Sequence, residues 1–299
     1  MAKGRVAIVG YGNIGRFALD ALLEAPDLEP AGVVRRRAER DESMPDRIPV
    51  VTDPKELGRI DAALLCVPTR AVPETAERYL AAGVNTVDSF DLHGDELVAL
   101  RRRLDGAAKA RGCVAVVAAG WDPGTDSVVR ALLEAMAPRG VTYTNFGPGV
   151  SMGHSTVVRA LEGVADAVSL TVPMGTGVHR RLVYVELEPG ASLDAVRERI
   201  LADPYFKNDD TRVIQVPSVR DLVDVGHGVR IERKGVSGRT HNQRFAFDMR
   251  INNPALTAQV MVAAARASLR LAPGAYTMLE IPAADLLPGD KEDLIRRLV

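Results

Sequence analysis

The first third of the chain alternates short apolar runs with segments in which apolar residues recur every three or four positions. Uninterrupted β-branched runs of this kind are typical of strands buried on both faces. They predict strands at residues 6–9, 29–34, 48–51, 62–67, 85–87 and 114–118, separated by helices that include 14–22, 72–82 and 95–110. Repeated strand–helix units predict a Rossmann-type, doubly wound parallel sheet with right-handed crossovers.

After about residue 122 the pattern changes. It predicts helices at 123–137, 192–202 and 254–271, strands at 167–172, 181–187, 229–233 and 244–251, and a turn region at 234–238. Neighbouring strands joined by turns predict a second α+β domain with a mixed or antiparallel sheet covered on one side. We therefore expect a dinucleotide-binding domain at 1–120 and a substrate-binding and dimerisation domain at 121–271. The amphipathic tail within 272–299 is expected to pack back onto the first domain.

A glycine fingerprint, Gly10-x-Gly12-x-x-Gly15, stands between the first strand and the first helix. The order strand, glycine turn, helix is what a dinucleotide site requires, because the pyrophosphate lies at the helix N-terminus. A glycine-rich turn of another α/β protein is the structural alternative. The expected cofactor-binding residues lie here and after the strand at 62–67: Gly10, Tyr11, Gly12, Asn13, Ile14, Gly15, Cys66, Val67, Pro68 and Thr69.

The second strand ends in Arg35, Arg36 and Arg37, with no Asp or Glu where the partner of an NAD ribose is expected. A guanidinium at this place can bind the 2′-phosphate of NADP. We therefore predict NADP rather than NAD, with Arg35 and Arg36 as its ligands. The alternative is a solvated basic run leading into a polar loop, in which Arg37 is simply exposed.

Composition excludes several classes of function. The 299 residues carry a formal net charge of −1, which gives no reason to expect nucleic acid or an anionic membrane as partner. No apolar run is long enough to span a bilayer, and residues 1–5 lead directly into a strand, so we expect no signal peptide. Cys66 and Cys113 read as buried thiols of a reducing compartment, which favours the cytoplasm. The five histidines are scattered, so we expect no metal site.

Two carboxylates, Asp91 and Asp122, follow neighbouring strands of the predicted sheet. Ligands of such sheets lie beyond the carboxyl ends of the strands, and paired carboxylates suit an ammonium substrate. Asp122 is equally well explained as a helix N-cap ahead of Pro123, and Asp91 as a turn residue. His93 lies nearby, although a surface histidine is the simpler interpretation.

Arg181 shares one face of a predicted strand with Val183, Val185 and Leu187. An arginine in phase with an apolar face is costly unless it is paired, and a substrate carboxylate would be one suitable partner. A protein carboxylate, or exposure at the end of the strand, is the alternative. Three further polar residues have ordinary structural explanations: Thr171 as a strand residue, His227 in a Gly-His-Gly turn and Asn253 as an N-cap.

Several motifs together resemble the meso-diaminopimelate dehydrogenase family: GYGNIG, VVRRR, CVPTR, DSFDLHGD, AAGWDPGTDS, TNFGPGVSMGHS and RINNPALTAQV. They run from residue 10 to about residue 260, and the length resembles the shorter form of the family, which is linked to broader use of 2-keto acids with ammonia. The resemblance implies reversible, NADP-dependent oxidative deamination of the D-centre of meso-2,6-diaminopimelate, a reaction of lysine biosynthesis. The products are L-2-amino-6-oxopimelate and ammonia. It also implies a homodimer built through the sheet of the second domain.

The same resemblance assigns residues. Asp91 and Asp122 match the acidic residues near the reacting amine. Four positions match those around the reacting centre and its carboxylate: Trp121, Phe146, Met152 and Gly153. Four more match the group that holds the distal L-centre: Thr171, Arg181, His227 and Asn253. Arg70 and His154 are weaker matches near the site.

Two other functions remain open from the sequence. One is an NADP-dependent D-amino acid dehydrogenase with a different substrate range. The other is a non-catalytic NADP-binding sensor, because a fold alone does not imply activity. The paired carboxylates and Arg181 argue against the sensor, since a sensor needs no amino-acid site.

Overall fold

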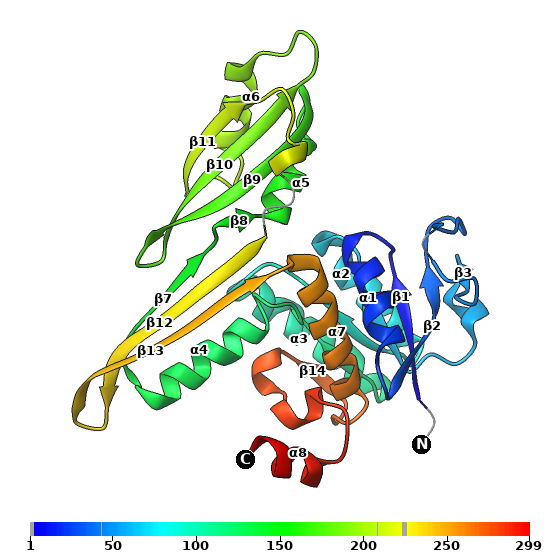
Figure 1. Cartoon of the computed structure of the whole chain (residues 1–299). Helices are drawn as coiled ribbons and strands as arrows, with labels where there is room; N and C mark the ends of the chain where they lie inside the picture. Colours follow the sequence, from blue (N-terminus) through cyan, green and yellow to red (C-terminus); the bar gives the residue numbers. More distant parts are fainter. Residues whose placement is uncertain (1–2, 43, 208, 223–225) are drawn as a thin grey trace. The chain divides into compact units, whose positions relative to one another are not determined.

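The computed structural model describes residues 3–42, 44–207, 209–222 and 226–299 and divides the chain into two compact units (Figure 1). Unit 1 contains residues 1–131 and 254–299, and unit 2 contains residues 132–253. Within unit 1, strands and helices alternate as the hydrophobic pattern predicts.

The sheet of unit 1 has seven strands in the order β14-β6-β5-β4-β1-β2-β3, and every neighbouring pair is parallel. This confirms the Rossmann-type fold. The strands are β1 (Gly4–Val9), β2 (Leu28–Val34), β3 (Val50–Val51), β4 (Ala62–Leu65), β5 (Asn85–Asp88), β6 (Val114–Val116) and β14 (Gly274–Tyr276). The six predicted strands are all present. β14 lies outside the prediction, because a three-residue strand has too few positions for a periodic pattern.

Helices cover both faces of this sheet, which explains why its strands lack polar breaks. Val6 and Ile8 belong to a core formed with α1 (Asn13–Leu23) and α7 (Asn253–Ser268). Val9 and Leu65 belong to a second core formed with α2 (Val72–Ala81) and α3 (Asp95–Arg111). Alternate residues of one strand therefore face different helical layers.

The compact units differ from the expected domains, whose boundaries were placed after residues 120 and 271. The first part of α4 (Thr125–Met136) stays with unit 1, where Val128 packs against the sheet core. Almost all of α7 also belongs to unit 1, because its alanine-rich side, with Ala258 and Ala264, is buried in that core. Helical periodicity predicted this helix but not its packing partner. Residues 272–299 lie in unit 1 through β14 and α8 (Lys291–Leu298).

Unit 2 contains two sheets, in the orders β11-β10-β9-β8 and β13-β12-β7. The β10–β11 pair is parallel and the other pairs are antiparallel, which confirms the predicted mixed α+β architecture. One side of the first sheet packs against α5 (Met152–Arg159) and α6 (Leu193–Ala202). The strands are β7 (Arg139–Phe146), β8 (Gly149–Val150), β9 (Val164–Gly175), β10 (Val178–Leu187), β11 (Asp210–Gln215), β12 (His227–Ser237) and β13 (Thr240–Ile251).

Several elements of unit 2 are absent from the prediction, notably β7, β11 and α5. β7 is buried at only one position and carries no clear apolar alternation, so its pattern gives little signal. β12 and β13 also extend further than predicted, and their turn lies at residues 238–239 rather than 234–238. Short 3₁₀ helices complete the structure: η1 (Pro54–Leu57), η2 (Thr69–Ala71), η3 (Arg220–Leu222), η4 (Met278–Glu280) and η5 (Ala283–Leu286). Among the described residues, no helix combines the length and apolar character needed to cross a membrane.

Candidate functional site

The glycine fingerprint of unit 1 lies where the strand order reverses between β1 and β4, the usual dinucleotide position in such sheets. Gly10 has a φ of +95°, and a Cβ there would stand 2.3 Å from the carbonyl oxygen of Cys66. A Cβ at Gly15 would stand 2.3 Å from the carbonyl oxygen of Gly10. A Cβ at Gly12 would meet no atom within 4 Å, so the loop is open beside the N-terminus of α1. This geometry fits a pyrophosphate.

Two arginines flank the ring of Tyr11, the residue between the first two glycines. The guanidinium carbons of Arg16 and Arg35 lie 6.0 and 5.9 Å from the ring centroid. Arg35 also donates from Nη1 to the carbonyl oxygen of Glu39 at 2.5 Å, while Arg36 is exposed. Sequence reasoning missed Arg16, although its place just after Gly15 in the helix puts it beside the fingerprint.

Asp91 lies three residues beyond β5 and accepts a hydrogen bond from Thr69, whose Oγ1 is 2.7 Å from its Oδ1. Thr69 begins the short helix that follows β4. A predicted cofactor residue and a predicted catalytic residue are thus joined directly. Arg70 and His93 are both exposed at the same end of the sheet.

Asp88, the last residue of β5, is a buried carboxylate that the sequence analysis did not identify. Its Oδ1 accepts from the backbone N–H groups of Phe90 at 2.9 Å and Ala118 at 3.0 Å, and burial raises its pKa to about 6. It therefore links the segment that carries Asp91 to the segment that leads to Asp122.

Asp122 is not the N-cap that the sequence suggested, because α4 begins three residues later, at Thr125. Its side chain is only 3% exposed and accepts an ion-paired hydrogen bond from Arg130 of α4. Trp121 beside it is buried. A further acid, Asp126, is buried four residues after Asp122 and was also missed, because its place in a first helical turn suggests an ordinary exposed acid.

Arg181 is the centre of a polar cluster in unit 2. Its Nε donates to Asp209 Oδ2 at 2.6 Å and its Nη1 donates to Thr171 Oγ1, with the side chain 15% exposed. Thr171 lies directly opposite Arg181 in the β9–β10 register, as strand pairing requires. The arginine is therefore held by a protein carboxylate, the alternative that the pattern had left open. Asp209 lies outside every predicted element, so no sequence signal marked it.

Three histidines surround this cluster and have lowered pKa values. Burial, followed by the charge of Arg181, lowers the pKa of His154 to about 4, and its ring bonds Ser151 Oγ at 2.8 Å and the Tyr205 carbonyl at 2.9 Å. Burial also lowers the pKa of His179 and of His227. His179 Nε2 accepts from the backbone N–H of Phe146 at 2.8 Å. Neutral histidines leave Arg181 as the local cation.

The Asn-Phe-Gly-Pro-Gly motif explains how these strands meet. A Cβ at Gly147, whose φ is +92°, would stand 2.1 Å from the Thr171 carbonyl oxygen. A Cβ at Gly149 would stand 2.0 Å from the Gly226 carbonyl oxygen. The motif thus fits tightly between β9 and the start of β12, which brings Thr171 and His227 into one region.

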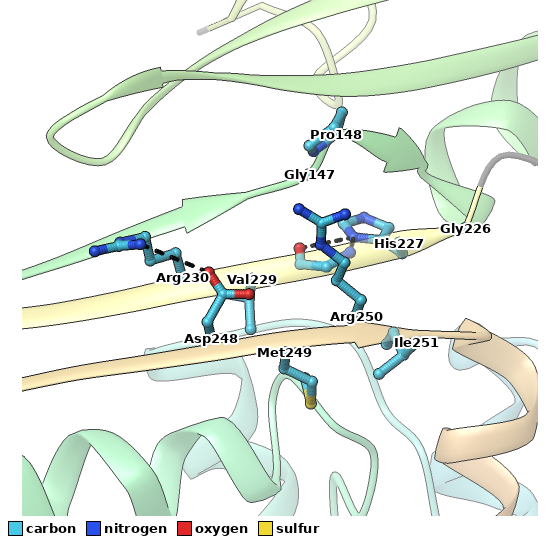
Figure 2. A pocket seen from close by; sticks show the side chains of 11 residues that line it. Gly147, Pro148, Gly226, His227, Val229, Arg230, Asp248, Met249, Arg250 and Ile251 are labelled. Carbon is cyan, nitrogen blue, oxygen red and sulfur yellow. Dashed lines mark hydrogen bonds and ion pairs between the residues drawn. The ribbon is translucent and has the colours of Figure 1, made fainter.

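His227 opens β12 rather than lying in the predicted turn, and it lines a pocket of about 240 Å³ (Figure 2). Figure 2 shows Arg250 of β13 projecting beside it, while Arg230 pairs with Asp248 at 3.8 Å. Asn253 is the first residue of α7, so the capping position falls on Asn252 instead. Met152 and Gly153 open α5 and are half-buried.

Within the described part of the chain, no group of three or more His, Cys, Asp or Glu side chains is arranged to hold a metal ion. Cys66 and Cys113 are free thiols, and burial raises the pKa of Cys66 to about 12.

Segments from both units match families of known proteins. Residues 4–87 match the oxidoreductase family with an NAD-binding Rossmann fold, and residues 120–178 match the diaminopimelic acid dehydrogenase C-terminal domain. The chain is 58% identical over 300 residues to the meso-diaminopimelate D-dehydrogenase of Bacteroides fragilis, with both chains fully covered. It is 35% identical over 329 residues to that of Ureibacillus thermosphaericus, again with both chains fully covered.

Solved structures agree with these relatives. The DAP dehydrogenase of Corynebacterium glutamicum in complex with DAP has a TM-score of 0.90 at 31% identity, with full coverage of both chains. An engineered D-amino acid dehydrogenase bound to NADP+ has a TM-score of 0.88 at 29% identity, also with full coverage. Full-length identity and fold agree, so the chain belongs to the meso-diaminopimelate D-dehydrogenase family of NAD(P)-binding oxidoreductases.

Proposed function

We propose that the protein catalyses the reversible, NADP-dependent oxidative deamination of meso-2,6-diaminopimelate at its D-centre. The products are L-2-amino-6-oxopimelate and ammonia, and the reverse reaction would accept 2-keto acids with ammonia. The observation that carries this proposal is the Arg181 cluster. It occurs in a chain that is 58% identical to a meso-diaminopimelate D-dehydrogenase. A simple amino acid would not need a second, arginine-centred site.

Arg181 suits the carboxylate of the distal L-centre. Its contacts to Asp209 and Thr171 use two of the five N–H donors of a guanidinium and fix its plane. A guanidinium fixed in this way binds a carboxylate at little entropic cost. His227 and Asn253 complete the proposed distal group.

At the reacting centre, Asp91 and Asp122 would bind the amine and accept its proton, because only a neutral amine can expel hydride. Trp121, Phe146, Met152 and Gly153 would shape the space around the centre and its carboxylate. The nicotinamide, when bound, supplies the hydride acceptor, and the protein supplies position and electrostatic field. Recognition of two different ends gives the choice between two chemically similar centres.

The preference for NADP over NAD rests on the arginines near Tyr11. The guanidinium carbons of Arg35 and Arg16 lie 5.9 and 6.0 Å from the centroid of its ring, and Arg36 follows Arg35 in the sequence. Cations at the end of the second strand suit a 2′-phosphate. An engineered D-amino acid dehydrogenase of similar fold was solved with NADP+.

The first test follows NADPH absorbance with the purified protein and the meso, D,D and L,L isomers of diaminopimelate, then repeats the assay with NAD. We expect turnover of the meso isomer with NADP and none of the L,L isomer. Turnover of the L,L isomer would refute the stereochemical proposal. Cofactor binding without turnover of any amino acid would support the non-catalytic sensor.

A second candidate function, a D-amino acid dehydrogenase of other range, is favoured by the likeness to the engineered D-amino acid dehydrogenase. Arg181→Ala separates the two. We expect it to abolish activity on meso-diaminopimelate while sparing any activity on simple D-amino acids. Arg180→Ala is the matched control, because Arg180 is the neighbouring arginine and pairs separately with Asp210. Equal loss on both substrates would refute the distal role.

Cofactor choice has its own test. Replacing Arg35 and Arg36 by Ala should weaken NADP binding far more than NAD binding, as measured by fluorescence titration of the reduced cofactors. Arg37→Ala is the control, because Arg37 is exposed and pairs only weakly, 3.8 Å from Glu39. If the double variant kept its preference for NADP, the 2′-phosphate assignment would be wrong.

The proposal also includes a homodimer built through the sheet of unit 2, and a cytoplasmic location. β13 supports the dimer, because it is a twelve-residue edge strand and such edges readily pair with another chain. Light scattering during gel filtration tests the dimer, and cell fractionation tests the location.

A further inference from the structure

Asp126, the second residue of α4, is a buried carboxylate without hydrogen-bond partners. Its side chain is 1% exposed, and neither carboxylate oxygen has a partner among the described residues. Its backbone N–H donates to the Trp121 carbonyl oxygen at 2.8 Å, so the residue is anchored beside the Trp-Asp motif. A buried carboxylate in this state is costly when ionised and calls for an explanation.

The charges that act on Asp126 come from Asp122, four residues earlier, and from Arg130, four residues later. Arg130 donates to Asp122, the other acid of the pair, and not to Asp126. Burial and the charge of Asp122 raise the pKa of Asp126 to about 7, although Arg130 opposes this shift. Of these two acids, Asp122 is therefore paired with the arginine, whereas Asp126 has no partner for its negative charge when it is ionised.

A second acid in the same helical position shows that this arrangement is unusual. Asp194 is the second residue of α6, is exposed, and pairs with Arg197 at 2.6 Å. That is the ordinary behaviour of an acid in a first helical turn. Asp126 has an arginine one turn away, yet the arginine pairs with Asp122 instead.

Building on the function proposed above, we propose that Asp126 is a positioning residue that shares one proton with Asp122. By its own ionisation it sets the pH range in which Asp122 accepts the proton of a substrate ammonium. While Asp126 is protonated, the ion pair of Asp122 with Arg130 has a neutral carboxyl group beside it. Once Asp126 ionises, a second negative charge stands four residues from Asp122, and the repulsion between like charges favours transfer of the ammonium proton to this pair of acids.

The proton balance of this step is simple. One N–H bond of the substrate ammonium breaks and one O–H bond forms on Asp122, while the nitrogen keeps the electron pair. With that pair free, the substrate carbon could lose its hydride to the nicotinamide that the glycine fingerprint would hold. The resulting iminium ion then reacts with one water to give the ketone and ammonium. The proton on Asp122 returns to solvent before the next turnover.

The test is the pH profile of kcat/KM for NADP-dependent deamination of meso-diaminopimelate from about pH 5 to pH 9. We expect the wild-type profile to rise through neutral pH. Asp126→Asn should lose that rise and fall roughly tenfold or more above it, since one unit of pKa is tenfold in protonation. Asp126→Glu should restore the rise, and Asp194→Asn should leave the profile unchanged. A uniform loss of rate at every pH, or an unchanged profile, would overturn the proposal.

A readout that needs no turnover separates this proposal from the proposed function. The carboxyl ¹³C resonances of labelled aspartates are titrated in the NADP-bound protein, and Asp88→Asn identifies the signal of Asp88, a second buried aspartate whose pKa is raised. We expect a further signal that titrates near neutral pH, is absent in Asp126→Asn and persists in Asp194→Asn. If no such signal exists, the shared proton is disproved even in an active enzyme. If it exists in a protein that turns over no isomer, only the proposed function fails.

Discussion

At the scale of single residues, the Arg181 cluster depends on keeping its neighbouring histidines neutral. His154 is the most strongly affected, with its pKa lowered to about 4 by burial and by Arg181. A neutral ring can bond both Ser151 Oγ and the Tyr205 carbonyl without adding a second cation beside the arginine. Because protonation of His154 would place a second positive charge near Arg181, we expect the folded protein to lose stability in acid.

The sign of this effect follows from proton linkage. Between about pH 6.5 and pH 4 the unfolded chain binds a proton at His154 that the folded protein refuses, so stability falls as the pH falls. The full loss is roughly 2–4 kcal/mol for a shift of this size. In urea unfolding between these pH values, His154→Gln should lose much less stability than the wild type. His93→Gln, at an exposed histidine, should behave as wild type, and a similar slope in both variants would contradict the prediction.

How much of the site the sequence could predict also differs by residue. The fingerprint glycines and the phase of Arg181 were predictable, because sterics and strand periodicity act over a few neighbouring residues. Asp209 was not, since it reaches Arg181 only after β10 and β11, which are distant in sequence, have paired. Asp126 was missed for another reason: its local pattern is that of an ordinary acid, and only tertiary burial makes it exceptional.

At the scale of elements, the buried parallel strands were predicted well because each is an unbroken apolar run. The partly exposed strands of unit 2 were predicted poorly, since their stability comes from partners distant along the chain. β7 illustrates this. It pairs with β12 along its whole length, and the connection from α4 into β7 is fastened by Arg233 of that strand.

Arg233 is therefore expected to matter for stability far more than a surface arginine. Its side chain is 3% exposed and donates to the carbonyl oxygens of Ala137 and Pro138 and to Thr142 Oγ1. Arg233→Met removes all three hydrogen bonds and leaves the carbonyl oxygen of the buried Ala137 unpaired, so it should cost roughly 2–4 kcal/mol in urea unfolding. Arg230→Met, at an exposed arginine of the same strand, should cost less than about 1 kcal/mol. Comparable losses in the two variants would refute this role.

At the scale of the whole molecule, the chain leaves unit 1 within α4 and returns to it at α7. Unit 1 is thus assembled from segments separated by more than a hundred residues, which is why its limits differ from the domain expected from the sequence. The local hydrophobic pattern predicts whether a segment is a helix or a strand, but not which hydrophobic core that segment packs into. The closing contact is visible in the structure: Arg266 of α7 binds both carboxylate oxygens of Asp27, at 2.6 and 2.7 Å.

This ion pair is the basis of a prediction about the unit as a whole. Arg266 is 6% exposed and also donates to the Leu286 carbonyl oxygen. Although burial alone would raise the pKa of Asp27, the hydrogen bonds and charge of Arg266 hold it below the usual value. Removing the arginine leaves a partly buried carboxylate unpaired, so Arg266→Met should destabilise unit 1 by roughly 2–4 kcal/mol.

Hydrogen exchange followed by mass spectrometry locates the effect of Arg266→Met. Faster exchange should appear in peptides from α7, from the start of β2 and from η5, because Arg266 of α7 contacts Asp27 just before β2 and Leu286 at the end of η5. Peptides from β9 and β10, which belong to the other unit, should exchange as in the wild type. Arg270→Met is the matched control two residues beyond the end of α7, since its side chain is exposed and bonds only carbonyl oxygens. If Arg266→Met accelerated exchange equally in both units, α7 would be stabilising the entire chain rather than closing the parallel-sheet core.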